Sequence, residues 1–186
     1  MERNLWAPWR MAYIKGLEQE AGVARAGAAS EGTANFLASA WKSPAQDSAN
    51  LVVHRDANGL IMLNRYPYAN GHLLVALGDA RPRLLDYTPA QRTAFWKLVD
   101  VATAIVERSL QPQGLNIGLN QGRAGGAGLP EHLHAHVLPR WSGDTNFMAT
   151  VAGARVVPDS LESVAAEFRR ALPNALASVE TNPDRS

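Results

Sequence analysis

Three histidines stand at every second position of one short segment, and they are the residues of this chain best suited to chemistry. The segment reads His132-Leu133-His134-Ala135-His136-Val137-Leu138. In a β-strand successive side chains point to opposite faces, so the three imidazoles would share one face while Leu133, Ala135 and Val137 pack into the core. Imidazole can act as a nucleophile, an acid, a base or a metal ligand, so this face predicts a reactive site.

Three uses of these histidines are open. A single zinc ion would need nitrogens converging at about 2.1 Å, whereas three same-face positions of a strand span about 13 Å. A histidine-rich surface strand without chemistry is the plainest alternative, but strict alternation after a glycine-rich loop at 122–128 argues against it. We favour the third use, in which a neutral imidazole attacks the α-phosphorus of a nucleotide and its neighbours hold phosphate oxygens and protonate the leaving group.

The glycine-rich loop supports chemistry on phosphate. Backbone N–H groups of such a loop can approach phosphate oxygens closely. Protein donors can then stabilise the in-line transition state. We therefore expect neither a metal nor another cofactor.

The composition narrows the classes of partner. The chain has 186 residues and a formal net charge of +1. A protein this close to neutral has no overall positive potential that would bind a nucleic acid or an acidic membrane. The lack of cysteine excludes thiol nucleophiles, disulfides and thiolate zinc sites. The first residues lack the apolar run of a signal peptide, and no stretch reaches the ~18 apolar residues that span a bilayer. We expect a cytoplasmic protein.

The elements around the triad predict an α+β domain with a mainly antiparallel sheet, one long helix and a C-terminal helix. Thr88, Pro89 and Gln91 form a capping box that begins the long helix. Strand 115–120 should bury one face, and Pro139 should close the triad strand. The expected strands are 51–55, 60–64, 72–77, 115–120 and 132–138.

The chain divides into three expected parts. Residues 1–50 are predicted to be an irregular extension that packs on the core, with a loop at 21–34. Residues 51–173 form the domain, and residues 174–186 form a flexible tail because they are polar after Pro173.

The motifs resemble the histidine triad (HIT) superfamily, whose signature is His-φ-His-φ-His-φ-φ with φ apolar. Segment 132–138 matches this signature, and segment 64–72 is similar to the family's Asn-x-x-Pro-x-x-x-Gly-His. Asn120-Gln121-Gly122, followed by the glycine loop and the triad, matches in order. The resemblance covers about residues 50–140 and implies a HIT-like fold.

Segments outside this core resemble one bacterial branch, which includes diadenosine tetraphosphate phosphorylases. These segments are 5–14, with Trp6 and Trp9, and 139–148, with Trp141. Many members of the branch carry a Cys-x-x-Cys pair in a zinc site. Asn35-Phe36-Leu37-Ala38-Ser39 occupies that region here, so a zinc like theirs is not expected.

The resemblance also implies roles for single residues. His134 matches the nucleophile, and the main-chain carbonyl of His132 would fix its tautomer. His136 and His72 match residues that contact phosphate, and Asn64 matches the residue that bonds the ribose hydroxyls. His54 lies outside the motifs and is predicted to be a bystander.

The loop residues complete the expected nucleotide site. Asn120 matches an amide that contacts the phosphate or leaving group, and Gln121 is the alternative because the loop is one residue longer than in human-type members. Gly128 and Leu129 sit where backbone amides meet phosphate. Leu129 offers only its N–H.

The family implies an enzyme that cleaves a dinucleoside polyphosphate through a nucleotidyl-His134 intermediate, with phosphate as the acceptor. Alternatives are hydrolysis of dinucleoside polyphosphates or of adenosine phosphoramidates with water, and a non-catalytic nucleotide-binding module. The resemblance also implies a homodimer that pairs the long helix and strand 115–120 across a two-fold axis.

Overall fold

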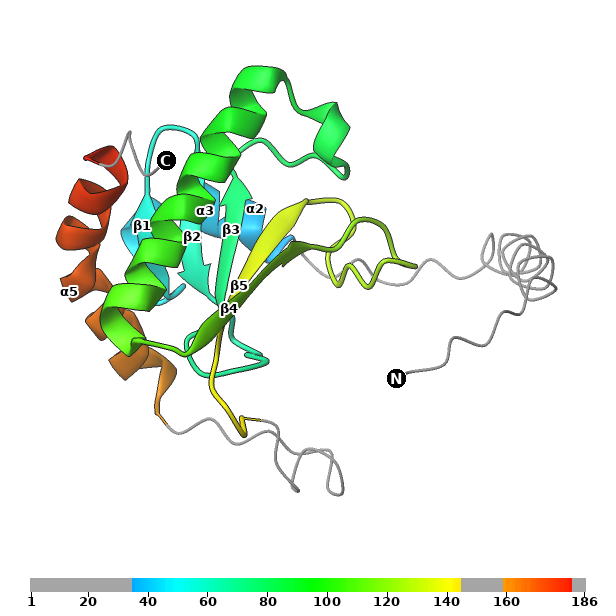
Figure 1. The fold of residues 1–186 in the computed structure, drawn as a ribbon. Helices are drawn as coiled ribbons and strands as arrows, with labels where there is room; N and C mark the ends of the chain where they lie inside the picture. Colours follow the sequence, from blue (N-terminus) through cyan, green and yellow to red (C-terminus); the bar gives the residue numbers. More distant parts are fainter. Residues whose placement is uncertain (1–34, 145–158, 182–186) are drawn as a thin grey trace, which may run out of the picture. The chain divides into compact units, whose positions relative to one another are not determined.

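The computed structural model describes residues 35–144 and 159–181, and it contains one five-stranded antiparallel sheet in the order β1-β2-β3-β5-β4 (Figure 1). The α+β fold class is confirmed, and β3 lies in mid-sheet as predicted. The N-terminal motif at 5–14, the loop at 21–34 and segment 145–148 lie outside the described residues. The strands are β1 (Val52–Arg55), β2 (Gly59–Leu63), β3 (Leu73–Leu77), β4 (Gly114–Leu119) and β5 (His134–Arg140).

Helices cover both faces of the sheet. Helix α3 (Pro89–Leu110) begins with the predicted capping box, and α5 (Leu161–Glu180) begins at Ser160, whose side chain caps it. Both pack on one face, in a core that contains Ile61, Val75 and Val137. The short α2 (Phe36–Lys42) packs on the opposite face over Leu74 and Ala76. No helix among the described residues is long and apolar enough to cross a membrane.

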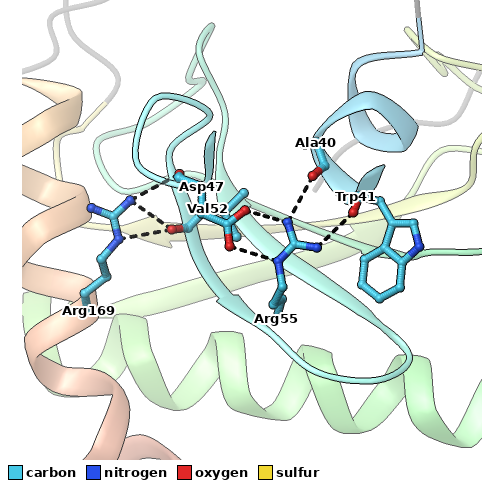
Figure 2. Close-up of polar contacts among 6 residues, drawn as sticks. All are labelled: Ala40, Trp41, Asp47, Val52, Arg55 and Arg169. Atoms are coloured by element: carbon cyan, nitrogen blue, oxygen red, sulfur yellow. Dashed lines mark hydrogen bonds and ion pairs between the residues drawn. The ribbon is translucent and has the colours of Figure 1, made fainter. Parts of the chain in front are cut away.

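Arginine side chains fasten the outer helices to β1. Figure 2 shows the Arg55 guanidinium donating to the carbonyls of Ala40 and Trp41 at the end of α2 and to both oxygens of Asp47. Arg169 of α5 donates to the carbonyl of Val52 at 2.9 Å and 3.0 Å. The carboxyl end of α2 is therefore held in place by the first hairpin.

Two expectations about the strands need correction. Strand β4 buries its apolar face only in part, because Leu115 and Leu119 pack on the core whereas Ile117 of this edge strand remains 44% exposed. Pro139 does not close β5, which continues to Arg140. Pairing of β5 with β3 ends at Val137, so Pro139 pairs only with Leu115 of β4, and its missing N–H leaves the central ladder intact.

The expected boundaries also change. The segment 1–50 is not wholly irregular, because α2 lies within it and buries Leu37 and Ala40. The flexible tail does not begin at residue 174, because α5 runs through Pro173 to Glu180. A proline inside a helix costs about 3 kcal/mol, but Ala175 is fully buried and Leu176 packs on the core beyond it. This burial offsets the cost.

Candidate functional site

Strand β5 and the neighbouring strand ends bring the predicted histidines together on the face that α2 covers. His134 pairs with Ala76 and His136 with Leu74, both of which belong to the core under α2. His72 lies directly before β3. The apolar residues between the histidines, Leu133, Ala135 and Val137, are buried in the opposite core, as predicted.

His134 is held in one orientation. Its Nδ1 donates to the main-chain carbonyl of His132 at 2.8 Å, which is the hydrogen bond that the resemblance to the HIT superfamily implied. The side chain is 5% exposed, and burial lowers the pKa of His134, with a smaller opposing effect from that carbonyl. The proton on Nδ1 of a neutral ring leaves the lone pair on Nε2 free, as a nucleophile requires.

His72 and His136 form a directed hydrogen-bonded pair. The backbone N–H of Tyr68 donates to Nδ1 of His72 at 3.2 Å, so the proton of a neutral His72 is on Nε2. Nε2 lies 2.9 Å from Nδ1 of His136 and donates to it. A neutral His136 then carries its proton on Nε2. Burial and, to a smaller extent, His134 lower the pKa of His136 to about 4.

Asn64 joins this pair from the end of β2. Its Nδ2 lies 3.2 Å from Nδ1 of His72, and its Oδ1 accepts from the N–H of Tyr66 at 2.9 Å. The structure therefore places Asn64 beside the histidines.

Tyr68 is a site residue that sequence reasoning missed. Its ring stacks on His136 with a centroid distance of 5.9 Å and an interplanar angle of 21°, and it lies 4.8 Å from the ring of His72. The tyrosine is 50% exposed, so it forms an outer wall of the pair. The signal was its position four residues before His72 in the matched motif.

His132 differs from its two partners because it lies before β5 and is fully buried. Its Nε2 donates to the carbonyl of Leu77 at 2.8 Å, and its Nδ1 lies 3.1 Å from Oδ1 of Asn35. Burial, the largest effect, lowers the pKa of His132. Asn35 was also missed as a site residue.

Asn120 and Gln121, the two candidate amides of the loop, form hydrogen bonds with different parts of the chain. Oε1 of Gln121 accepts from the N–H of Leu84 at 3.0 Å, so this amide is directed to the 3₁₀ turn η2 (Leu84–Asp86). Asn120 instead donates to the carbonyl of Gly126 at 3.4 Å, within the glycine loop. Of the two amides predicted to contact phosphate or the leaving group, Asn120 is therefore the one bonded within the glycine loop.

The end of this loop packs against the triad. The Leu129 side chain is buried in the core under α2, and its carbonyl accepts from the N–H of His132 at 3.3 Å. A Cβ added at Gly128 would meet open space, so its backbone is accessible. His54 lies on β1, which is separated from β3 by β2 and from β5 by β2 and β3.

Metal ligands do not gather in the described parts of the chain. No group of three or more histidine, aspartate or glutamate side chains there could hold a metal ion. The triad rings instead bond to carbonyl, amide and imidazole partners.

The sequence of the chain matches a known domain family and proteins with assigned names. The HIT domain matches residues 45–143, which is more than half of the chain. The chain belongs to the HIT family. This HIT protein is 35% identical over 159 residues to a Mycobacterium tuberculosis protein named AP-4-A phosphorylase, covering 86% of this chain and 78% of the relative.

Other members of the HIT family match less closely. A Schizosaccharomyces pombe protein named bis(5'-nucleosyl)-tetraphosphatase [asymmetrical] is 32% identical, covering 50% of each chain. A zinc-bound histidine triad protein from Mycobacterium smegmatis has a TM-score of 0.60 and 26% identity, over 74% of this chain and 94% of that one. A histidine triad nucleotide-binding protein from Sulfolobus tokodaii has a TM-score of 0.63 at 20% identity, over 77% and 97%.

Proposed function

We propose that this HIT protein cleaves a dinucleoside polyphosphate, such as diadenosine tetraphosphate, at the α-phosphate, with phosphate as the acceptor. The observation that carries the proposal is the hydrogen bond from His134 Nδ1 to the His132 carbonyl at 2.8 Å, which leaves Nε2 free in a neutral ring. The 35% identity to a protein named AP-4-A phosphorylase supports this substrate and this acceptor.

The reaction has two displacements at one phosphorus atom. Nε2 of His134 attacks the α-phosphorus, the N–P bond forms and the bond to the bridging oxygen breaks, so that ATP leaves from diadenosine tetraphosphate. A phosphate oxygen then attacks the same phosphorus, the N–P bond breaks and ADP forms. Each displacement benefits from donors placed on the equatorial oxygens.

The neighbouring side chains have distinct proposed roles. His136, neutral with its proton on Nε2, donates to a phosphate oxygen. His72, which was predicted to contact phosphate itself, is fully buried and fixes the ring of His136. Asn64 bonds the ribose hydroxyls. Asn120 contacts the leaving group, because Gln121 is bonded to Leu84.

Backbone N–H groups complete the proposed phosphate-binding site. The N–H groups of Gly128 and Leu129 meet the phosphate, which the open space beside Gly128 permits. No metal ion or other cofactor is required for these contacts.

Product analysis tests this function. Diadenosine tetraphosphate is incubated with the protein in the presence and absence of phosphate, and the nucleotides are separated by chromatography. We expect ADP and ATP, with turnover that rises with phosphate. Release of AMP at a rate independent of phosphate would contradict the phosphorylase assignment.

A hydrolase is the second candidate. The relative named bis(5'-nucleosyl)-tetraphosphatase favours water as the acceptor, although it matches only 50% of this chain. The same assay separates the two, and a panel that includes adenosine phosphoramidates tests whether an amine leaving group is preferred. If the protein binds nucleotide but turns over none of these compounds, it is a non-catalytic nucleotide-binding module.

We also propose that the protein acts as a homodimer. Strand β4 is a sheet edge with the exposed side chain of Ile117, and a second copy could cover it. Sedimentation should give the mass of two chains, and Ile117→Lys should shift it toward one.

A further inference from the structure

The side chain of Asn35 joins two distant parts of the chain. Its Oδ1 accepts from the N–H of Ala38 at 2.9 Å and so caps α2. The same oxygen lies 3.1 Å from Nδ1 of His132, 97 residues further along. Asn35 lies outside the matched HIT domain at 45–143.

Helix α2 presents this oxygen from a fixed position. Arg55 holds the carbonyls of Ala40 and Trp41 at the other end of the helix (Figure 2), and the side chain of Leu37 is fully buried between them and Asn35. The capping bond from Ala38 further restricts the rotation of the amide. The hydrogen-bond partner of His132 is therefore supplied by a rigid element.

His132 is held by contacts from outside the sheet ladder. Strand β5 begins at His134, so the carbonyl of His132 lies outside the strand. This carbonyl is the group that orients His134, at 2.8 Å from its Nδ1. The peptide group of this carbonyl is held at its other end by the N–H of Leu133, which donates to the carbonyl of Arg81 at 2.8 Å, and the N–H of His132 donates to Leu129 at 3.3 Å. The contacts of the His132 ring act together with these two bonds on the direction of the carbonyl.

We propose that Asn35 is a positioning residue, which holds the His132 ring between two oxygen atoms and so keeps the His132 carbonyl aligned with His134. The proposal rests on the proposed function of His134 as the nucleophile. Leu77 supplies the second oxygen, at 2.8 Å from Nε2.

The proton on His132 reports on this contact. The amide oxygen of Asn35 can only accept, so it stabilises the form of the ring that has N–H at Nδ1 as well as at Nε2. Other groups act on the same ring: burial and His134 lower the pKa of His132, whereas the Leu77 carbonyl, Glu131 and Asp79 raise it. Removing Asn35 alone should lower this pKa and leave those effects in place.

Three substitutions separate the cap from the contact with His132. Asn35→Ser retains a good helix cap, but its hydroxyl is too short to reach the imidazole. Asn35→Ala removes both functions, and Asn35→Asp retains both. Ser160→Ala removes the cap of α5 and serves as a matched control for lost capping away from the site.

The experiment combines steady-state kinetics with NMR titration of the imidazole rings of the full chain. The contact with Asn35 is a hydrogen bond only when His132 carries both N–H groups, so the effect of Asn35→Ser and Asn35→Ala should grow as the pH falls. In the protonated form we expect kcat to be lower about five- to tenfold, with little change in KM, for the loss of one hydrogen bond. The pKa of His132 should fall in both. Asn35→Asp should restore kcat and raise the pKa, and Ser160→Ala should leave both unchanged.

The outcomes separate this proposal from the proposed function. A wild-type kcat in Asn35→Ser that persists as the pH falls, or a lower kcat with an unchanged His132 pKa, overturns the positioning role. If the wild-type protein turns over no dinucleoside polyphosphate, the proposed function fails. The titration of His132 in Asn35→Ser then still decides whether the contact exists.

Discussion

His136 should remain neutral well below the pH at which an ordinary histidine gains its proton. Burial and His134 lower its pKa to about 4, from the ordinary value of 6.5 for histidine. As the pH falls, the unfolded chain therefore binds a proton before the folded chain does. The contribution of His136 to stability is complete above pH 6.5 and is lost as the pH falls toward about 4.

The size of this loss follows from the pKa difference. Each tenfold change in proton affinity corresponds to about 1.4 kcal/mol, so the whole difference would be about 3 kcal/mol. Solvent screening of this partly exposed ring reduces the expected loss to about 1–2 kcal/mol.

Urea denaturation at pH 7.5 and pH 4.5 measures this loss against the variant His136→Asn. The amide oxygen of asparagine can still accept from Nε2 of His72, so the variant keeps the hydrogen bond but has no proton to bind. His132 and His134 are present in both proteins, and their contributions cancel. The wild type should lose about 1–2 kcal/mol more than the variant on acidification. An equal loss in the two proteins would refute the reasoning, as would a ring titration of His136 near 6.5 by NMR.

Three further predictions concern His134 as the proposed nucleophile, the hydrogen bonds of Arg55 to α2, and Gly59 in the first hairpin. His134→Ala should abolish turnover, by at least a thousandfold, while nucleotide binding by calorimetry stays within about tenfold; surviving activity would exclude the covalent mechanism. Arg55→Met should lower the free energy of unfolding by about 2–3 kcal/mol, because it removes the donors to two α2 carbonyls and to Asp47 at a partly exposed site. An unchanged urea midpoint would show that these hydrogen bonds contribute nothing to stability. Gly59→Ala should lower the free energy of unfolding by about 1–3 kcal/mol, because a Cβ there would clash with the Ala76 carbonyl of the neighbouring strand. Gly114→Ala, whose Cβ meets open space, is the control, and equal stability of the two variants would contradict this reasoning.

Short-range patterns in the sequence predicted much of the fold and the central residues of the site. The alternation of the triad placed the imidazoles opposite Leu133, Ala135 and Val137, because a strand has a period of two residues. The capping box at Thr88 placed the beginning of α3, since its bonds join residues three apart. The resemblance to the family supplied the contact between His134 and the His132 carbonyl.

Long-range contacts could not be predicted in the same way. Nothing near Asn35 indicates that its partner is His132, because the two are joined only by the folding of α2 over the sheet. The exposure of Ile117 depends on the place of β4 at the sheet edge, which its alternating sequence does not encode. The continuation of α5 beyond Pro173 depends on the burial of Ala175.

The pairing of His72 with His136 also gives the hydrogen bonds of the site a fixed direction. His72 is fully buried, and its Nδ1 faces the N–H of Tyr68 and the amide of Asn64, which are donors that do not release their protons. These donors and the hydrogen bond between the rings orient both imidazoles in one sense, so the pair ends in an N–H group on Nε2 of His136. Because the pKa of His136 lies well below neutrality, this N–H group should remain an uncharged donor throughout the neutral pH range.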